Sequence, residues 1–284
     1  MMFRIKLIVR DLLVVMLYLS GFAWLQNLYL RHVYGGSYRI LCFHWVGAEG
    51  RAGFESKLIW LKRRYDINPL GELLKRQANG ELRGNEIAIT FDDGFSDFHE
   101  VVLPLLIRHD VPVTLFVPSG MLDLNFEEAK DFADQRIGIN KPLLDRNQLV
   151  DIAKSGLVDI QSHSHTHCDF GAEPMSVLLE ELCQSRRTIE GITRQPVDML
   201  AFPYGDVLNT SETAFKALQQ ADYSFAMTIV PGFNHGRTNK FKLYRDSLNP
   251  NMNNFLLRAW LCGGYDLPKK LANLVRVNVK QQKT

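Results

Sequence analysis

The segment NEIAITFDDG, residues 85–94, decides the fold because a mostly apolar run ends there in two carboxylates and a glycine. A short apolar run bounded by turn signals predicts a buried strand. In α/β barrels, catalytic groups gather at the C-terminal ends of the strands. Asp92 and Asp93 stand at such a strand end, and Gly94 permits a turn that lets the two carboxylates face different partners. Taken alone, Asp-Asp-Gly is also a common turn sequence.

Further strands and helices alternate along the chain on both sides of this segment. The predicted strands are RILCFHWVG (39–47), VPVTLFVPSG (111–120), LVDIQSH (157–163) and MLAFPYG (199–205). The predicted helices lie around residues 54–65, in LPLLIRHD (103–110), in NQLVDIAKS (147–155), around residues 178–189 and in ETAFKALQQA (212–221). This alternation predicts a mostly parallel sheet with helices outside it. We expect a distorted (β/α) barrel rather than an open sheet, because the sequence has no glycine-rich nucleotide loop.

Two local patterns refine this prediction. Asp145 and Gln148 resemble a capping box that opens a helix, and Gly156 would end that helix. Residues 121–142 are rich in charge and predict an irregular insertion that could shape a substrate cleft.

Composition limits the possible functions. The chain has 284 residues, of which 46% are hydrophobic, enough for one large domain, which we expect at residues 37–265. The formal net charge is only +2, with no basic stripe of the kind that nucleic-acid-binding proteins show, so we expect no nucleic-acid partner. The four cysteines form no CxxC pair, and we expect them to act as small buried apolar residues.

The two ends of the chain carry a different pattern. Residues 12–30 contain no charge and follow Arg4, Lys6 and Arg10, so residues 1–36 are expected to hold an apolar helix that attaches the protein to a membrane. This helix could span the bilayer or lie flat in its interface, and the side of the membrane that the barrel faces stays open. A cleaved signal peptide is disfavoured, since no A-x-A-like site follows. Residues 266–284 form a basic tail without acidic residues after Asp266.

The segment SHSHTH, residues 162–167, places three of the eight histidines within five residues. His163 and His167 would share one face of a helical turn, and all three histidines would share one face of an extended chain. Either geometry presents two imidazoles to one metal ion. Zinc favours two or three such nitrogens with a carboxylate and an open position. The carboxylate would come from Asp92 or Asp93.

The segments TFDDG (90–94), HSHTH (163–167) and FPYG (202–205), in this order and at these separations, resemble the polysaccharide deacetylases of carbohydrate esterase family four. The resemblance covers roughly residues 39–250 and implies a distorted (β/α) barrel. It implies that Asp92 is the general base and that Asp93, His163 and His167 hold a divalent metal, for which we expect Zn²⁺. It also implies that Tyr204 donates its backbone N–H to the oxyanion.

The sequence departs from the family pattern at two places. Many members carry an arginine before the Pro-Tyr-Gly turn, where this chain has Leu200 and Ala201. The late leucine-x-histidine that supplies the general acid has no clear match, and His235 is the candidate by its position in the chain. His44 is another histidine at a predicted strand end, and the ending FKLYRDS with Arg245 resembles one branch of the family.

The resemblance implies a bacterial cell-envelope hydrolase that removes N-acetyl groups from N-acetylhexosamine units of a polysaccharide or a lipid-linked glycan. In this reaction Asp92 would act as base on the attacking water. Two alternatives remain open. One is removal of another acyl group, such as a formyl or O-acetyl group, and the other is a catalytically weak glycan-binding protein that retains the metal.

Overall fold

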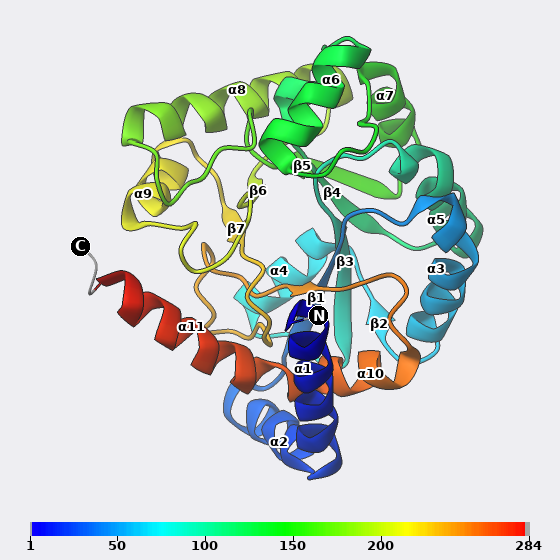
Figure 1. The fold of residues 1–284 in the computed structure, drawn as a ribbon, viewed down its shortest axis with the longest axis vertical. Coiled ribbons are helices and arrows are strands. Elements are labelled where there is room, and N and C mark those ends of the chain that lie inside the picture. The colour runs from blue at the N-terminus through cyan, green and yellow to red at the C-terminus, as the bar shows by residue number, and fades with distance from the viewer. Residues whose placement is uncertain (1, 282–284) are drawn as a thin grey trace.

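In the computed structural model, which describes residues 2–281, eight parallel strands curl into an incompletely closed barrel (Figure 1). The strand order is β7-β6-β5-β4-β3-β1-β8, and β2 pairs with β3. An isolated parallel bridge joins Met227 of β7 to Leu243, three residues before β8, so the end of the sheet folds back toward its start. The strands are β1 Tyr38–Phe43, β2 Asp66–Ile67, β3 Glu86–Phe91, β4 Val113–Val117, β5 Val158–Ser162, β6 Met199–Ala201, β7 Phe225–Met227 and β8 Asp246–Ser247.

Helices cover the outside of the barrel, as the alternating pattern predicts. The helices that surround the barrel are α3 Gly47–Lys62, α4 Leu70–Asn79, α5 Leu103–His109, α6 Phe126–Phe132, α7 Arg146–Lys154, α8 Met175–Thr193 and α9 Glu212–Gln220. Short helical turns are η1 Phe98–Val102, η2 Ser119–Met121, η3 Ala133–Ile137 and η4 Trp260–Gly264. The helices at the two ends of the chain are α1 Met2–Leu19, α2 Phe22–Tyr34, α10 Asn254–Ala259 and α11 Asp266–Gln281.

The central strands are buried on both faces, because helices pack outside and side chains fill the barrel inside. Alternation sends every second side chain inward. In β1, Leu41 and Phe43 pack against the outer helices, whereas Ile40 joins the inner cluster with Ala88 of β3. Cys42 is paired with Thr90 in the register of these strands. The inward side of β1 and β3 therefore leads to His44 and Asp92 at their ends.

The predicted barrel strands and helices are confirmed, and so is the capping box of α7, in which Asp145 and Gln148 cap each other's backbone. The expectation of an irregular insertion at residues 121–142 is wrong in part. This segment contains α6 and η3, and α6 begins with its own capping box between Asn125 and Glu128. The four cysteines are unpaired, and Cys42 and Cys168 are buried as expected.

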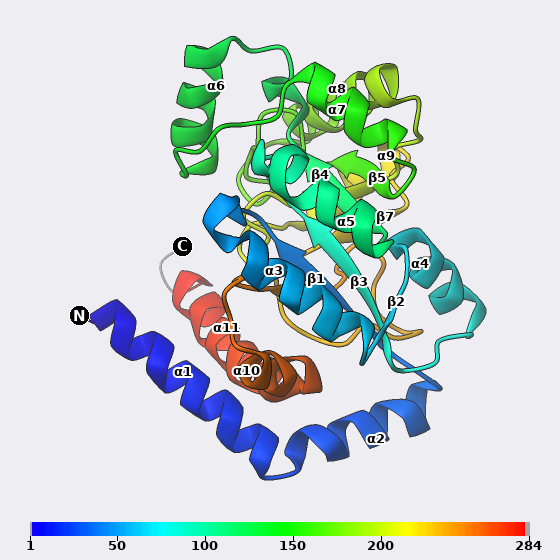
Figure 2. The same ribbon diagram turned by 90° about the vertical axis from the view of Figure 1, so that its right-hand side faces the viewer.

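The N-terminal region consists of two helices rather than one. Figure 2 shows α1 and α2 as a V beside the barrel, with α10 and α11 between α1 and the strands. Within the described residues, no single helix is long and apolar enough to cross a membrane, whereas Val9–Leu19 and Phe22–Tyr34 together have that length and composition but are bent by 66°.

A buried ion-pair network fixes the C-terminal helices to the barrel. Arg39 of β1 donates hydrogen bonds to Asp246 at 2.7 Å and to Asp266 at 2.8 Å, and all three side chains are almost fully buried. The indole of Trp260 also donates to Asp246. The segment expected as a basic tail therefore begins inside the structure, as helix α11. Lys283 lies outside the described residues.

Candidate metal centre and active site

One cavity at the C-terminal ends of the strands gathers most of the predicted site residues. It has a volume of about 160 Å³. Its lining comprises His44, Asp92, Asp93, Ile137, Ile139, His163, His167, Phe202, Tyr204 and Ile229. A larger cavity of about 350 Å³ lies at the opposite end of β1 and β3, around Tyr38 and Glu86, and contains none of the predicted site residues.

The three predicted metal ligands meet within this cavity. The Nε2 atoms of His163 and His167 lie 3.3 and 3.5 Å from the same carboxylate oxygen of Asp93. All three side chains are buried. Asp93 follows β3 and His163 follows β5, two strands that both pair with β4, so the pairing brings together residues seventy positions apart.

Hydrogen bonds fix the tautomers of both imidazoles. His163 donates from Nδ1 to the carbonyl of Ala201 at 2.8 Å, and His167 donates from Nδ1 to the carbonyl of Arg136 at 2.9 Å. Each Nε2 atom is then left with a lone pair directed at a carboxylate oxygen, an arrangement that requires a cation or a proton between them. The donor set of two neutral imidazoles and one carboxylate fits a divalent metal with open coordination positions.

The surroundings favour the charged form of the carboxylate. Burial alone would raise the pKa of Asp93, but the adjacent imidazoles of His163 and His167 outweigh it and hold this pKa well below its usual range. For His163, burial lowers the pKa, but Asp92 and Asp93 outweigh it and raise the pKa above its usual value. The pocket is therefore negative enough to attract a cation.

Asp92 is held by an arginine from a distant part of the chain. The two terminal nitrogens of Arg245 donate to the two oxygens of Asp92, each at 2.7 Å, and both residues are buried. Arg245 is itself fixed by a hydrogen bond from Nε to the carbonyl of Thr228. Burial raises the pKa of Asp92, but Arg245 and then His163 outweigh it, so the net pKa is lowered and the carboxylate stays ionised.

Arg245 therefore supplies the arginine that appeared to be missing before the Pro-Tyr-Gly turn. The sequence contained the segment FKLYRDS, but its spacing gave no indication that this guanidinium reaches Asp92, 153 residues earlier. Asp92 thus has a guanidinium partner although Leu200 and Ala201 stand where many family members have an arginine.

The turn after β6 positions Tyr204 at the rim of the cavity. Its backbone N–H donates no hydrogen bond to any described residue, whereas its hydroxyl donates to the carbonyl of Arg136 at 2.7 Å. Tyr204 has φ 61°, Asp93 has φ 71° and His167 has φ 58°. Such left-handed conformations are strained for residues other than glycine and concentrate at functional sites. The loop carrying the histidines is consequently neither the helical turn nor the extended chain considered from the sequence.

His44 enters the same cavity from the end of β1. A ring nitrogen of His44, a carboxylate oxygen of Asp92 and the sulfur of Cys42 lie within 4.8 Å of one another. The parallel register pairs Phe43 with Phe91, which places His44 beside Asp92 as the two strands end. Side chains alternate between the two faces of a strand, so His44 follows the inward-facing Cys42 of β1 just as Asp92 follows Thr90 of β3. This alternation is the signal in the sequence that could have identified His44.

His235, the candidate general acid from the sequence, is not near this cavity, so that assignment is wrong. Its neighbour Asn234 bridges Tyr38 at the start of β1, whereas the cavity lies at the end of this strand. The imidazole of His235 stacks on Tyr34 of α2 with ring centroids 3.8 Å apart. Position along the chain was misleading because the segment returns to the opposite end of the barrel.

Two supporting residues were not identified from the sequence. Glu181 of α8 accepts hydrogen bonds from the backbone N–H groups of His165 and Thr166 at 2.8 Å, which fixes the loop between the two histidines predicted as metal ligands. The carbonyl of Arg136, at the end of η3, orients both His167 and Tyr204. His165 points away from the predicted ligands, toward the hydroxyl of Ser119 at 2.8 Å.

Comparison with known proteins agrees with this geometry. The family profile described as polysaccharide deacetylase matches residues 79–226, just over half of the chain, from before Asp92 to beyond Tyr204. The chain belongs to the polysaccharide deacetylase family. It is therefore a hydrolase of a metal-dependent family, and the expected family and enzyme class are confirmed.

Relatives of this polysaccharide deacetylase include the poly-beta-1,6-N-acetyl-D-glucosamine N-deacetylase of Staphylococcus epidermidis. The two are 23% identical over 226 residues, which cover 76% of this chain and 72% of the relative. Two solved structures share its fold. The Streptococcus pyogenes deacetylase PplD in complex with acetate has a TM-score of 0.66 at 20% identity, with 79% of this chain and 98% of that chain covered. IcaB from Ammonifex degensii has a TM-score of 0.65 at 18% identity, with 82% and 97% covered.

Proposed function

We propose that this polysaccharide deacetylase removes N-acetyl groups from N-acetylhexosamine units of a bacterial cell-envelope polysaccharide or lipid-linked glycan. The observation that carries the proposal is the placement of the ligand triad of Asp93, His163 and His167 in one cavity with Asp92, which Arg245 holds ionised. The relative from Staphylococcus epidermidis, an N-deacetylase by name, supports this choice of acyl group.

We assign the metal as Zn²⁺, because two neutral imidazoles and one carboxylate with open positions are the donor set that catalytic zinc prefers. When bound, the ion would supply Lewis-acid polarisation of the acetamide carbonyl. The Nδ1 hydrogen bonds of His163 and His167 would keep both Nε2 lone pairs directed at the ion.

Residues of the chain activate the water, stabilise the oxyanion and line the cavity. Asp92 accepts a proton from the attacking water, whose oxygen bonds to the carbonyl carbon. The backbone N–H of Tyr204 donates to the carbonyl oxygen as negative charge develops on it, and the left-handed turn holds this N–H free for that purpose. The hydrophobic side chains of Ile137, Ile139 and Ile229 line the cavity and limit access of bulk water.

Cleavage of the carbon–nitrogen bond requires a proton on the leaving amine, and we assign His44 as the general acid. It is the histidine of the cavity that lies outside the ligand triad, and its ring lies within 4.8 Å of Asp92. Protonated His44 would give its proton to the amine nitrogen as the bond breaks, leaving acetate and a free amino sugar. Asp92 then releases the proton it accepted and His44 takes up a proton from solvent, which restores the starting state of both groups.

The location is also part of the proposal. We place the protein at a membrane of the bacterial cell envelope, attached through residues 1–36. The uncharged stretch of residues 12–30, the basic residues before it and the absence of acidic residues after Asp266 in the C-terminal segment support attachment to an anionic membrane surface.

The decisive experiment is measurement of acetate release from N-acetylated oligosaccharides, with wild-type protein and the Asp92→Asn variant both loaded with Zn²⁺. The proposal predicts release by the wild type and at least about a 100-fold lower rate in the variant at equal metal content. A panel with N-formyl and O-acetyl sugars identifies the acyl group. If the metal-loaded wild type acts only on these substrates, or on no glycan, the proposed N-deacetylase function is wrong.

A further inference from the structure

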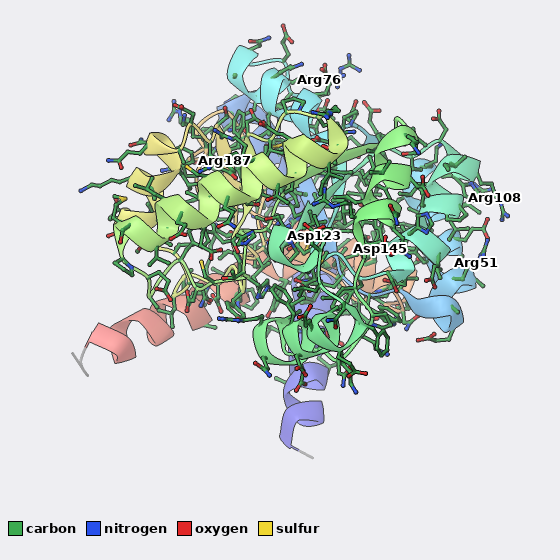
Figure 3. All side chains as sticks on the ribbon, turned by 90° about the horizontal axis from the view of Figure 1, so that it is seen from above. Arg51, Arg76, Arg108, Asp123, Asp145 and Arg187 are labelled. Atoms are coloured by element: carbon green, nitrogen blue, oxygen red, sulfur yellow. The ribbon has the colours of Figure 1, made fainter. Side chains whose placement is uncertain are left out.

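The exposed apolar surface of the protein is concentrated on α1 and α2. Among the described side chains, eleven of the eighteen large hydrophobic residues that are exposed belong to these two helices. They are Val9, Leu12, Leu13, Met16, Leu19, Phe22, Trp24, Leu25, Leu28, Tyr29 and Val33. By contrast, the outer faces of α3, α5 and α8 carry exposed charges such as Arg51, Arg108 and Arg187 (Figure 3). A contiguous apolar surface of this extent marks an interaction site.

The opposite flank of the two helices is packed on η4 and α10, which lie between α1 and the barrel strands. Val14, Ala23 and Leu30 are buried, and α1 approaches η4 so closely that a side chain at Gly264 would meet the carbonyl of Val14 at 2.8 Å. Arg10 lies over the ring of Trp260 at 5.0 Å. Among the described side chains, both helices are therefore docked between Arg10 and Leu30.

Polar contacts reinforce this docking. Gln26 of α2 donates to Asp266 at 3.4 Å, and Asp266 is the partner of Arg39 in the buried network. Asn27 donates to the carbonyl of Cys262 at 3.3 Å. For α1 and α2 to cross a bilayer, they would have to leave this surface and uncover it, because the polar barrel cannot enter the hydrocarbon region.

Several hydrogen bonds hold the bend between the helices. Gly21 takes the left-handed conformation with φ 80°, the N–H of Ser20 donates to the carbonyl of Met16 at 2.9 Å, and the N–H of Gly21 donates to the carbonyl of Tyr18 at 3.3 Å. The Ser20 hydroxyl donates to the carbonyl of Leu17 and accepts from the N–H of Phe22. The turn is therefore a defined break between α1 and α2.

The three most exposed of these apolar side chains flank the turn, with Leu19 at 69%, Trp24 at 68% and Met16 at 60%. Figure 2 shows that the turn is the point of the V farthest from the barrel, so the apolar surface is convex. Two rigid convex surfaces touch over a small area, which disfavours a second copy as the occupant. A fluid lipid leaflet can surround a wedge of this shape.

We propose that α1 and α2 insert as a bent wedge into one leaflet of a phospholipid membrane, with the turn at Ser20 and Gly21 deepest and without crossing the bilayer. Tyr29, on the second turn of helix after the break, has an amphipathic ring suited to the headgroup level. The inference deepens the membrane attachment proposed above and decides between a spanning and a flat arrangement.

Binding of the full-length protein to phospholipid vesicles containing anionic lipid tests the wedge. Replacement of the two most exposed residues together, Leu19→Glu with Trp24→Glu, is expected to weaken vesicle binding at least about 100-fold. The matched control is Phe126→Glu on α6, where a 76% exposed phenylalanine lies outside the wedge and its removal should leave binding unchanged. Equal weakening by both variants, or by neither, would overturn the proposal.

The depth and sidedness of the wedge need their own measurements. Lipids brominated along the acyl chain should quench tryptophan fluorescence in the wild type and much less in Trp24→Phe, which should still bind. In membrane vesicles of defined orientation, a protease added outside should reach an N-terminal epitope tag and the barrel from the same side. Access from opposite sides would establish a spanning helix, and a dimer that binds no vesicles would establish a second copy as the occupant. Neither measurement depends on turnover, so the result stands apart from the deacetylase assay.

Discussion

The guanidinium of Arg245 binds both oxygens of Asp92, each at 2.7 Å, inside the barrel. The two residues lie 153 positions apart in the chain, with Arg245 just before the last strand, β8, and Asp92 just after the third strand, β3. Arg245 does not line the cavity, so it acts on the reaction through Asp92 as a positioning residue. This pair explains how the protein keeps an ionised, oriented carboxylate without an arginine before the Pro-Tyr-Gly turn.

Replacement of Arg245 should therefore reduce the chemical step and leave the metal in place. For Arg245→Met we expect kcat to fall about 100-fold or more, because Asp92 loses both its orientation and its charge partner. The conservative variant Arg245→Lys should recover part of this loss, since it restores the charge without the bidentate contact. Zinc content should remain that of the wild type, and Arg237→Met, at an exposed arginine remote from the cavity, should be fully active.

The same pair predicts a change in pH dependence. Arg245 and His163 hold the pKa of Asp92 below its ordinary value, so the ionised base persists as the pH falls and is lost only as the pH passes through this lowered pKa. In Arg245→Gln, burial should raise the pKa of Asp92 because the opposing charge of Arg245 is gone. The acidic limb of the kcat/KM profile should therefore move to higher pH. The profile must be recorded with metal content measured at each pH, because loss of the ion also lowers activity. An unmoved limb at full occupancy would show that Arg245 does not control the base.

Removal of the carboxylate ligand should abolish metal binding. In Asp93→Ala only two imidazoles remain, so we expect loss of both stoichiometric zinc and turnover, measured by metal analysis and acetate release. His165→Ala is the matched control, because this histidine lies in the same loop but forms a hydrogen bond with Ser119 and does not face Asp93. Tight stoichiometric zinc in Asp93→Ala would mean that the ligand set is different.

Substrates with different leaving groups test the general acid. His44→Gln should lower the hydrolysis of an N-acetyl amide by about 100-fold to 10,000-fold, because an amine leaves poorly without a proton. Hydrolysis of an aryl acetate, whose phenolate leaves unaided, should fall far less. His235→Gln should change neither rate, as this residue stacks on Tyr34 at the opposite end of the barrel. Equal losses on amide and ester would show that His44 does not act as the acid.

The buried network around Arg39 predicts a large effect on stability. Arg39→Met leaves Asp246 and Asp266 buried without their cation, and we expect the free energy of unfolding to fall by about 3–5 kcal/mol. Arg83→Met is the control, since its pair with Asp66 is 4.0 Å long and exposed and should contribute at most about 1 kcal/mol. Urea unfolding of the two variants measures the difference, and equal effects would show that the network does not secure the barrel.

Much of the fold and of the metal site follows from patterns that act over short distances. The sequences of β3 and β5 are mostly apolar because both faces of each strand are largely buried. The strands can therefore be predicted from the order of apolar residues in the sequence alone. The meeting of Asp93 with His163 could be predicted because each lies at the end of a predicted strand, and parallel strands end at the same edge of a sheet. The capping box at Asp145 is equally local.

Tertiary structure alone decided the remaining features. Whether Arg245 or His235 comes close to Asp92 depends on the path of the last strand segment, which enters beside β1 and leaves His235 at the far end. Likewise, residues 12–30 read as one uncharged stretch, but packing on η4 and the turn at Gly21 divide it into two helices at 66°. Sequence periodicity determines which residues face inward, whereas the contacts between distant segments determine which of those residues meet.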